Sequence, residues 1–397
     1  MTIDSRAQLE KAISRRLDRH LDFLTALIRH PSVRGQERPA QDVVADHWSG
    51  LGLEVHAVPC RSDPGGINLA ARHIGVDHGC QSLILNAHCD VTPVDQPERW
   101  LTPPFEPVVD NGILRGRGAL DDKAGLAVIS LAADVLIHEL GTPLGGDLIL
   151  QSVVEDETTG HGSHALVEAG WTADGVIICD GTWPERIIVG HLGQAWVDVT
   201  VRGEPVAAAS ARRGINPITL SQRLIADLEQ FVGEQNRTIA SYAGIEQPFL
   251  VNVGALHAGV WAGSVPASAE MKIQVSFPPP WLPDLILAEV QRRAAAISDR
   301  IEIRPGLLQA PPFSVAKSEL VADLRNVIQK HASAPVLLMT VSGHCDMRHF
   351  QTPNVCLYGP GGGKNPHGID EYYHLDHLPF VAANILEFTL DWCNRKR

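Results

Sequence analysis

The chain has 397 residues, of which 44% are hydrophobic and 20% are charged, a composition typical of globular proteins with two or three domains. Its formal net charge of −13 argues against nucleic acid or an anionic membrane as a partner, because both attract clustered Lys and Arg. No apolar run approaches the ~18 residues of a membrane span, and seven cysteines without C-x-x-C spacing favour buried free thiols over a disulfide scaffold.

The N-terminal segment is predicted to be a helix. Residues 7–30 carry apolar side chains at helical spacing, from Leu9 and Ile13 to Leu24 and Ile28. The preceding residues and this helix are too charged for a signal peptide, and free thiols suit a reducing compartment. A cytoplasmic protein is therefore expected.

Strands and helices alternate after this helix. The runs "GLEVHAV", "INLAARH" and "SLILNAH" are typical of strands, as are "DLILQSVVE" and "DGVIICD", and the segments "AGLAVISLAADVLIHEL" and "SHALVEAG" between them are typical of helices. Several of these strands are apolar along their whole length, which indicates a sheet covered on both faces. The sequence predicts an α/β catalytic domain with a mixed sheet and helices on both faces.

The pattern changes near residue 193. Half-exposed strands and two amphipathic helices follow, and this order is typical of a small α+β sandwich. We expect a catalytic domain formed by residues 1–193 and 305–397, with residues 194–304 inserted as a dimerisation or lid domain. The exposed strands and helices of the insert predict a homodimer.

Acidic residues and histidines lie where strands are expected to end, the edge at which open α/β sheets bind ligands. They are His88 with Asp90, Asp121, the run 155–157, Asp180 and, in a Gly-rich C-terminal loop, His367. Each alone has an ordinary interpretation, such as a surface histidine, a helix N-cap or a solvated acidic loop. Together they would repel one another unless cations held them, and oxygen and imidazole ligands suit zinc, manganese or cobalt.

Five motifs occur in the order "HCDV", "GRGALDDKAG", "EDETTG", "CDGTW" and "PHGIDE". In these motifs, and in the place of its inserted domain, the sequence resembles the zinc-dependent exopeptidase and deacylase family that includes carboxypeptidase G, acetylornithine deacetylase, succinyl-diaminopimelate desuccinylase and aminoacylase. The resemblance covers nearly the whole chain. It implies two divalent metal ions, with zinc favoured and manganese or cobalt as alternatives.

The resemblance also implies a role for each motif residue. The carboxylate of Asp121 would bridge both metals. The peptide bond between Asp121 and Asp122 would be cis. His88 and Asp180 would bind one metal, and Glu157 and His367 the other. Asp90 would orient the ring of His88 from behind.

The acidic motif departs from the family pattern of a general-base Glu followed by a ligand Glu. Counting back from Gly160 makes Glu157 the ligand and Asp156 the base, one methylene shorter than usual. Glu155 is the alternative base if the loop shifts. Either carboxylate would carry a proton from metal-bound water to the leaving amine.

A second departure lies in the insert, where "GEPVAAASARRGIN" has Ala207 at the position of a family histidine. The resemblance implies that this histidine donates to the oxyanion across a dimer interface, and losing such a donor typically costs ~10²–10³ in rate. Two interpretations stay open: natural divergence, with Asn216 or His257 as the donor, or an introduced inactivating substitution.

Substrate contacts follow less directly. Many relatives have an Arg in the strand after "SVPASAE" to bind a substrate carboxylate, and "MKIQVSFPPP" has none. Arg348, or Arg212 with Arg213, would take this role, or else the substrate has no such carboxylate. The loop "GPGGGK" around Gly361 lacks the spacing of a P-loop and is expected to line the substrate pocket.

The predicted function is a dinuclear metal-dependent amidohydrolase, a deacylase or dipeptidase. It would cleave an amide bond of a small N-acyl amino acid or dipeptide-like substrate by attack of metal-bound hydroxide. Two alternatives remain: the same scaffold hydrolysing another C–N bond (carbamoyl, amidine or arylamine), or a catalytically silent binding protein.

Overall fold

The chain divides into two units in the computed structural model, which describes residues 6–62, 65–141, 143–181 and 183–397. Unit 1 takes in residues 1–189, 315–339 and 345–397, and unit 2 takes in residues 190–314 and 340–344. Most of unit 2 is thus an insertion into unit 1. The predicted insert, 194–304, lies within unit 2, and strand β14 (Ile301–Ala310) crosses its C-terminal boundary.

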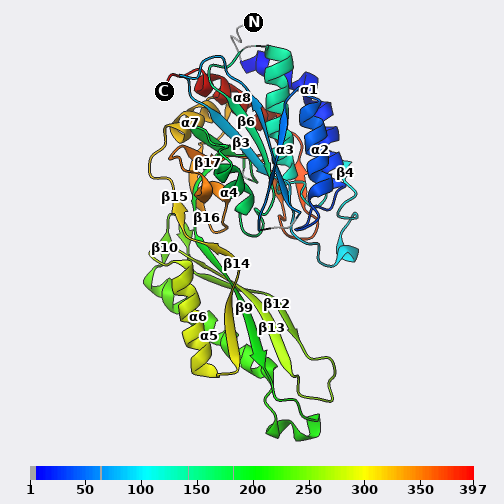
Figure 1. Cartoon of the computed structure of the whole chain (residues 1–397), viewed down its shortest axis with the longest axis vertical. Coiled ribbons are helices and arrows are strands. Elements are labelled where there is room, and N and C mark those ends of the chain that lie inside the picture. The colour runs from blue at the N-terminus through cyan, green and yellow to red at the C-terminus, as the bar shows by residue number, and fades with distance from the viewer. Residues whose placement is uncertain (1–5, 63–64, 142, 182) are drawn as a thin grey trace. The chain divides into compact units, whose positions relative to one another are not determined.

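A mixed sheet forms the centre of unit 1 (Figure 1). Its order is β1-β2-β6-β3-β7-β17-β8, with β16 paired to β8. β15, which pairs with the end of β8, belongs to unit 2, as do the last residues of β8 and β16. The pairs β3–β6, β3–β7 and β7–β17 are parallel, whereas β1–β2 and β2–β6 are antiparallel. The bounds are β1 (Val55–Pro59), β2 (Ile67–His73), β3 (Leu83–His88), β6 (Leu148–Val153), β7 (Gly175–Ile178), β8 (Arg186–His191), β15 (Phe313–Ser314), β16 (Leu337–Val341) and β17 (Val355–Leu357).

Helices cover both faces of this sheet, because successive side chains of its strands point to opposite sides. In β2, Leu69 and Ala71 join the main core, whereas Ala70 packs with Val153 and Leu166 on the other face. The helices are α1 (Arg6–Ile28), α2 (Arg38–Ser49), α3 (Lys123–Asp134), α4 (His161–Glu168), α7 (Glu319–His331) and α8 (His377–Cys393), and α3 continues as a π-helix, η2 (Val135–Leu140). The predicted α/β class with a mixed sheet is confirmed.

A small sheet in unit 1 ties the C-terminal loop to the segment before α3. Its order is β18-β19-β5-β4, with all pairs antiparallel. The bounds are β4 (Val108–Asp110), β5 (Ile113–Arg115), β18 (Gly363–Lys364) and β19 (Tyr372–His374), and the short helices of unit 1 are η1 (Pro97–Arg99) and η4 (Asp346–His349). This pairing brings residues about 250 positions apart to one place.

Unit 2 is an antiparallel sheet with two helices on one face, as expected for an α+β segment. The sheet order is β12-β13-β9-β14. Burial in β13 alternates, and its buried side chains form one core with those of the helices. The elements are β9 (Gly193–Arg202), η3 (Ala208–Arg213), α5 (Pro217–Thr238), β10 (Ser241–Tyr242), β11 (Ile245–Glu246), β12 (Leu250–Ala258), β13 (Ser268–Phe277), α6 (Pro283–Ile297) and β14.

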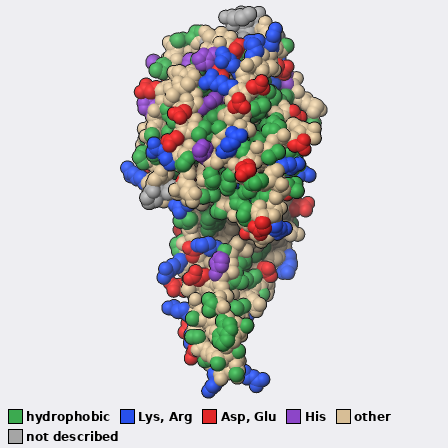
Figure 2. All heavy atoms as spheres, turned by 90° about the vertical axis from the view of Figure 1, so that its right-hand side faces the viewer, with side chains coloured by type: hydrophobic (Ala, Val, Ile, Leu, Met, Phe, Trp, Pro, Cys, Tyr) green, Lys and Arg blue, Asp and Glu red, His purple; other side chains and the backbone are tan. Residues whose placement is uncertain are grey.

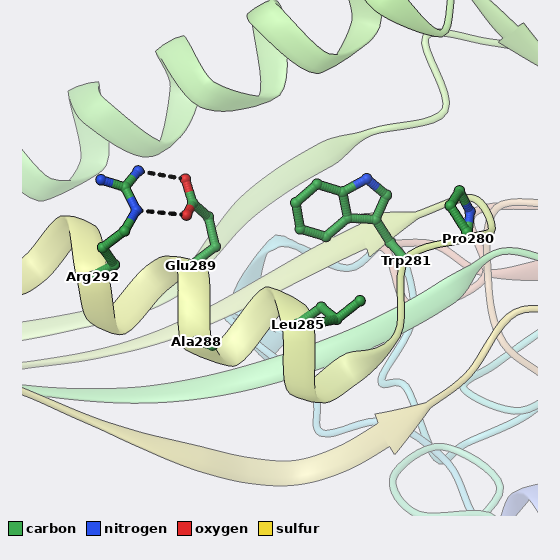
Figure 3. A pocket seen from close by; sticks show the side chains of 6 residues that line it. All are labelled: Pro280, Trp281, Leu285, Ala288, Glu289 and Arg292. Carbon is green, nitrogen blue, oxygen red and sulfur yellow. Dashed lines mark hydrogen bonds and ion pairs between the residues drawn. The ribbon is translucent and has the colours of Figure 1, made fainter.

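An open hollow of about 360 Å³ lies beside α6 in unit 2 (Figure 3). Trp281 and Leu285 give it an apolar lining. Its two charged residues, Glu289 and Arg292, bind each other through hydrogen bonds of 2.7 and 2.8 Å. Because these charges are engaged, the hollow is not the candidate site for catalysis.

The seven cysteines are free and buried, as predicted. Acidic and basic side chains of the described residues are interspersed on the face in Figure 2. Among the described helices, none is long and apolar enough to cross a membrane.

Candidate metal centre

Three parallel strands bring acids and a histidine to one edge of the unit 1 sheet. β3 ends at His88, whose register partner at the end of β6 is Val153. The acidic run 155–157 follows β6, and Asp180 follows the end of β7 at Ile178. Because parallel strands end at the same edge, residues far apart in the sequence converge there.

Asp121 and His367 reach this edge from two loops. Asp121 lies just before α3, and its peptide bond to Asp122 is cis, as the resemblance implies. The buried carboxylate of Glu371 accepts hydrogen bonds from the backbone N–H of Leu120 (2.9 Å) and of Asp121 (3.1 Å). His367 lies between β18 and β19, so the small sheet carries it toward Asp121.

The five predicted ligands form two groups of three that share Asp121. Within each group, His88–Asp121–Asp180 and Asp121–Glu157–His367, the ligand atoms lie within 4.8 Å of one another. Oδ1 of Asp121 is 3.1 Å from His88 Nε2, and Oδ2 is 3.1 Å from His367 Nε2. His367 Nε2 is also 2.9 Å from Glu157 Oε2. The two oxygens of Asp121 thus face different groups, as a bridging carboxylate requires.

Asp90 contacts one residue of each group, His88 and Glu157. The prediction is that Asp90 orients the ring of His88, and the contact to this ring is made mainly by the backbone of Asp90. The backbone carbonyl of Asp90, at 2.9 Å, is the nearest acceptor for His88 Nδ1, and its carboxylate is farther, at 3.6 Å. That carboxylate accepts the backbone N–H of Glu157 at 3.2 Å. A proton on Nδ1 directed to the carbonyl leaves the lone pair of Nε2, on the side of Asp121, available to a metal ion.

The electrostatics of the centre favour cations. Burial, and after it the charge of Asp121, raises the pKa of Glu157 to about 7 and that of Asp180 to about 6. Burial also acts to raise the pKa of Asp121, but hydrogen bonds from His367 and His88 outweigh it and hold this pKa below its usual range. Buried carboxylates in contact must keep protons or share positive ions.

The donor set therefore fits two divalent ions. Each group offers one imidazole nitrogen and carboxylate oxygens, which zinc, manganese and cobalt accept. Among the described residues, these are the groups of three or more potential ligands that the structure brings together. The orientation of His88 by a carbonyl is typical of metal-binding histidines.

The two candidate bases lie in different surroundings. Asp156 Oδ2 is 3.9 Å from His88 Nε2, and burial, followed by the charge of Asp346, raises the pKa of Asp156 well above its usual range. Glu155 is fully buried, and its carboxylate binds the guanidinium of Arg34 and accepts a hydrogen bond from Thr159 Oγ1 at 2.7 Å. Asp156 therefore lies beside the ligands, whereas the carboxylate of Glu155 is held in other contacts.

The predicted substrate contacts are divided between the units. In unit 1, Arg348 donates to the carbonyls of Cys345 (2.6 Å) and Thr159 (2.8 Å), so its guanidinium is engaged by the backbone. Gly361 is a buried loop residue with φ +59°. In unit 2, Ala207 is exposed beside η3, and Asn216 caps α5 by accepting from Ile218 N at 2.9 Å. Their substrate-binding roles stay predictions.

Sequence reasoning missed three residues that hold the centre together. Glu371 supports the Asp121 loop and Arg34 binds Glu155, while Asp346 lies beside Asp156. Glu371 ends the quoted motif "PHGIDE" and was therefore within reach. Arg34 and Asp346 carry no local pattern, because their partners are distant in the sequence.

Comparisons with known proteins point to one family of hydrolases. The model of Peptidase family M20/M25/M40 matches residues 84–391. The N-formyl-4-amino-5-aminomethyl-2-methylpyrimidine deformylase of Bacillus subtilis (strain 168) is 27% identical over 98% of both chains. The succinyl-diaminopimelate desuccinylase of Methylobacterium sp. (strain 4-46) is 28% identical over 92% of this chain and 95% of its own.

The fold is shared with a solved structure. Human carnosine dipeptidase 1 superposes with a TM-score of 0.80 at 16% identity, covering 98% of this chain and 100% of its own. At this identity the likeness shows the fold alone. The expectations of an α/β fold with an inserted domain and of a hydrolase acting on amide C–N bonds are confirmed at this level.

Proposed function

This chain belongs to Peptidase family M20/M25/M40, and we propose that it is a dinuclear metal-dependent amidohydrolase of small N-acyl compounds. The observation that carries the proposal is the pair of ligand groups sharing Asp121, with the Asp156 carboxylate beside them. His88 and Asp180 would hold one ion, Glu157 and His367 the other, and Asp121 both. When bound, such ions activate water and polarise the scissile carbonyl together.

Asp156 is the proposed general base and acid. It would take a proton from the attacking water and return it to the leaving amine. Its position supports this role, because its carboxylate oxygen Oδ2 lies 3.9 Å from Nε2 of the predicted ligand His88. Glu155 is less suited, since its carboxylate is bound by Arg34 and Thr159.

The substrate class is proposed from the matched relatives and the departures in unit 2. An N-acyl amino acid or dipeptide-like compound is supported by the relative named succinyl-diaminopimelate desuccinylase, whose name describes removal of an acyl group. A second candidate is an acylated amine without a carboxylate, such as a formamide. The lack of Arg in β13 favours it, as does the deformylase relative at 98% coverage of both chains.

A homodimer through unit 2 is also proposed. β12 is an edge strand of the unit 2 sheet, and its side chains Leu250 and Leu256 are 52% and 43% exposed. An exposed edge with apolar side chains supports pairing with a second copy. Size-exclusion chromatography with light scattering tests this, because a mass of 43.0 kDa would contradict it. Zinc as the native metal and a cytoplasmic location are proposed on the grounds given by the sequence.

The test is amine release from a panel of N-acyl amino acids, dipeptides and N-formyl amines. Protein loaded with zinc, manganese or cobalt is compared with EDTA-treated protein, each as wild type and as Ala207→His. Turnover that needs metal supports the proposal, and a rise of about a hundredfold with the histidine would mean that an oxyanion donor is missing at position 207. Equal turnover would place the donor elsewhere. No turnover with two metals bound would contradict the deacylase function and favour hydrolysis of another kind of C–N bond.

A further inference from the structure

The end of α1 and the residues after it, 27–34, are bonded to three parts of the metal centre. Lys123, two residues after the bridging Asp121, is buried and donates from Nζ to the carbonyls of Leu27 (2.9 Å) and His30 (2.8 Å). These carbonyls belong to the last turn of α1 and the residues after it, where carbonyls lack helical partners. The Asp121 loop is thereby fastened to the end of α1.

The same segment is fastened to the end of β3. Ser32 is fully buried, and its hydroxyl donates to the carbonyl of Cys89 at 2.6 Å. The carbonyl of Ser32 accepts the N–H of Val91 at 3.0 Å. These two bonds bracket Asp90, which contacts both His88 and Glu157.

Arg34 connects the segment to the acidic turn after β6. Its Nε and Nη2 face the two carboxylate oxygens of Glu155, and Nη2 also donates to the carbonyl of Ser62 at 2.9 Å. This is the forked pairing for which a guanidinium is suited and an ammonium is not. Glu155 is fully buried, so the pair is sheltered from solvent on the carboxylate side.

Glu155 in turn holds the shape of the acidic turn. It has a left-handed backbone, with φ +70°, which a side chain other than Gly adopts at a cost. Its backbone carbonyl accepts from the N–H groups of Thr158, Thr159 and Gly160 at 3.2, 2.9 and 2.7 Å. Its carboxylate accepts from Thr159 Oγ1 at 2.7 Å. One residue therefore closes the turn through both its backbone and its side chain.

We infer that Arg34 is a positioning residue that acts through Glu155 on the turn carrying Asp156 and Glu157. By binding the Glu155 carboxylate, it holds the residue whose conformation sets the direction of the next two side chains. The general base and one metal ligand thus depend on a cation contributed by the segment after α1. The expected effect of Arg34 on turnover rests on the proposed function. Its expected effect on metal binding rests on the geometry alone.

The experiment compares the full-length wild type with Arg34→Lys, Arg34→Met, Glu155→Gln and the double variant Arg34→Met/Glu155→Gln. Arg38→Met is the matched control, because Arg38 lies four residues away and pairs only with the exposed Asp42 in the contacts described. Metal-free protein is titrated with cobalt and followed by calorimetry and by visible absorption. Turnover is measured with two equivalents of cobalt, and the melting temperature is recorded for each variant.

Arg34→Met and Glu155→Gln should each weaken one of two cobalt-binding events by about tenfold and lower kcat by about 10–100-fold, with KM changed less than threefold. The double variant should be no worse than the poorer single variant, since both remove one linkage. Arg34→Lys should fall between wild type and Arg34→Met. Arg38→Met should match the wild type within twofold.

Two results would overturn the inference. One is wild-type cobalt affinity and kcat in Arg34→Met and Glu155→Gln. The other is a loss of cobalt affinity and kcat in Arg34→Met that is fully explained by a smaller folded fraction of this variant, while Arg34→Lys and Glu155→Gln keep the wild-type cobalt affinity and kcat. If the wild type binds two cobalt ions but turns over nothing in the panel, the proposed function fails, and the cobalt titration still decides the role of Arg34.

Discussion

Replacing Glu371 by Gln should loosen the loop that carries the bridging aspartate. In the fully buried carboxylate, Oε2 accepts from Arg117 Nη1 (2.8 Å) and Gly118 N (3.0 Å), and Oε1 accepts from Leu120 N (2.9 Å) and Asp121 N (3.1 Å). A glutamine side chain keeps one oxygen and replaces the other by an NH₂ group, which cannot accept. Two of the four hydrogen bonds are therefore lost.

The magnitude follows from the charge on the acceptor. Hydrogen bonds to charged groups contribute about 1.5–3 kcal/mol each, so losing two should lower the free energy of unfolding by about 3–6 kcal/mol. Arg117, whose exposed fraction is 2%, also loses its ionic partner and keeps the carbonyl of Gly368 at 3.1 Å and the ring of Trp100 at 5.2 Å. Against a typical total of about 5–15 kcal/mol, this is a large loss.

The assay is urea unfolding of metal-free protein, followed by circular dichroism. Metal is removed because bound ions would add their own stabilisation. Glu319→Gln is the control: its side chain is 79% exposed and its ion pair with Arg395 is 4.0 Å long, so a change within about 0.5 kcal/mol is expected. A loss below about 1 kcal/mol in Glu371→Gln, with an unchanged m value, would refute the reasoning, because a neutral amide would then serve as well as the carboxylate.

Three further outcomes are expected. Asp156→Asn should lower kcat by about 10²–10⁴-fold while elemental analysis still finds two metals per chain, and loss of metal would reassign this residue. EDTA should abolish turnover and lower the melting temperature, because an ion at a hundred times its Kd stabilises the folded protein by about 2.7 kcal/mol. An unchanged melting temperature would contradict the proposed metal site. Burial lowers the pKa of His47 from 6.5 to about 3, so between pH 6.5 and pH 3 the unfolded chain binds a proton that the folded chain does not. The free energy of unfolding should therefore fall as the pH is lowered, by about 2 kcal/mol at pH 5. Urea unfolding of His47→Gln should show a smaller fall, and an equal fall would exclude His47 as the cause.

The order of elements and the ligand types were predictable because they depend on local patterns. The apolar run before His88 predicts a buried strand, and parallel strands end at one edge, so the acids after β6 and β7 were expected near it. The resemblance then assigned Asp121 the bridging role, and the structure turns its two oxygens toward different groups. Periodicity and strand-end chemistry suffice for the strands and their shared edge, whereas the bridging role of Asp121 comes from the resemblance.

The supports of the site could not be predicted in this way. Arg34 and Glu155 are 121 positions apart, and Asp121 and Glu371 are 250 apart. Nothing in either local sequence indicates that such loops meet. The same holds for Asp90, whose carboxylate binds the backbone of Glu157 while its carbonyl orients His88.

The sequence by itself determined the class of fold and the set of residues suited to bind metal, because hydrophobic periodicity and side-chain chemistry are properties of short stretches. The resemblance of its five ordered motifs indicated the family. Only the tertiary structure decided which carboxylate is held by an arginine and which stands beside the ligands, as Glu155 and Asp156 show. Those roles depend on burial and on partners that distant loops supply, and a burial or a partner exists only once the chain has folded.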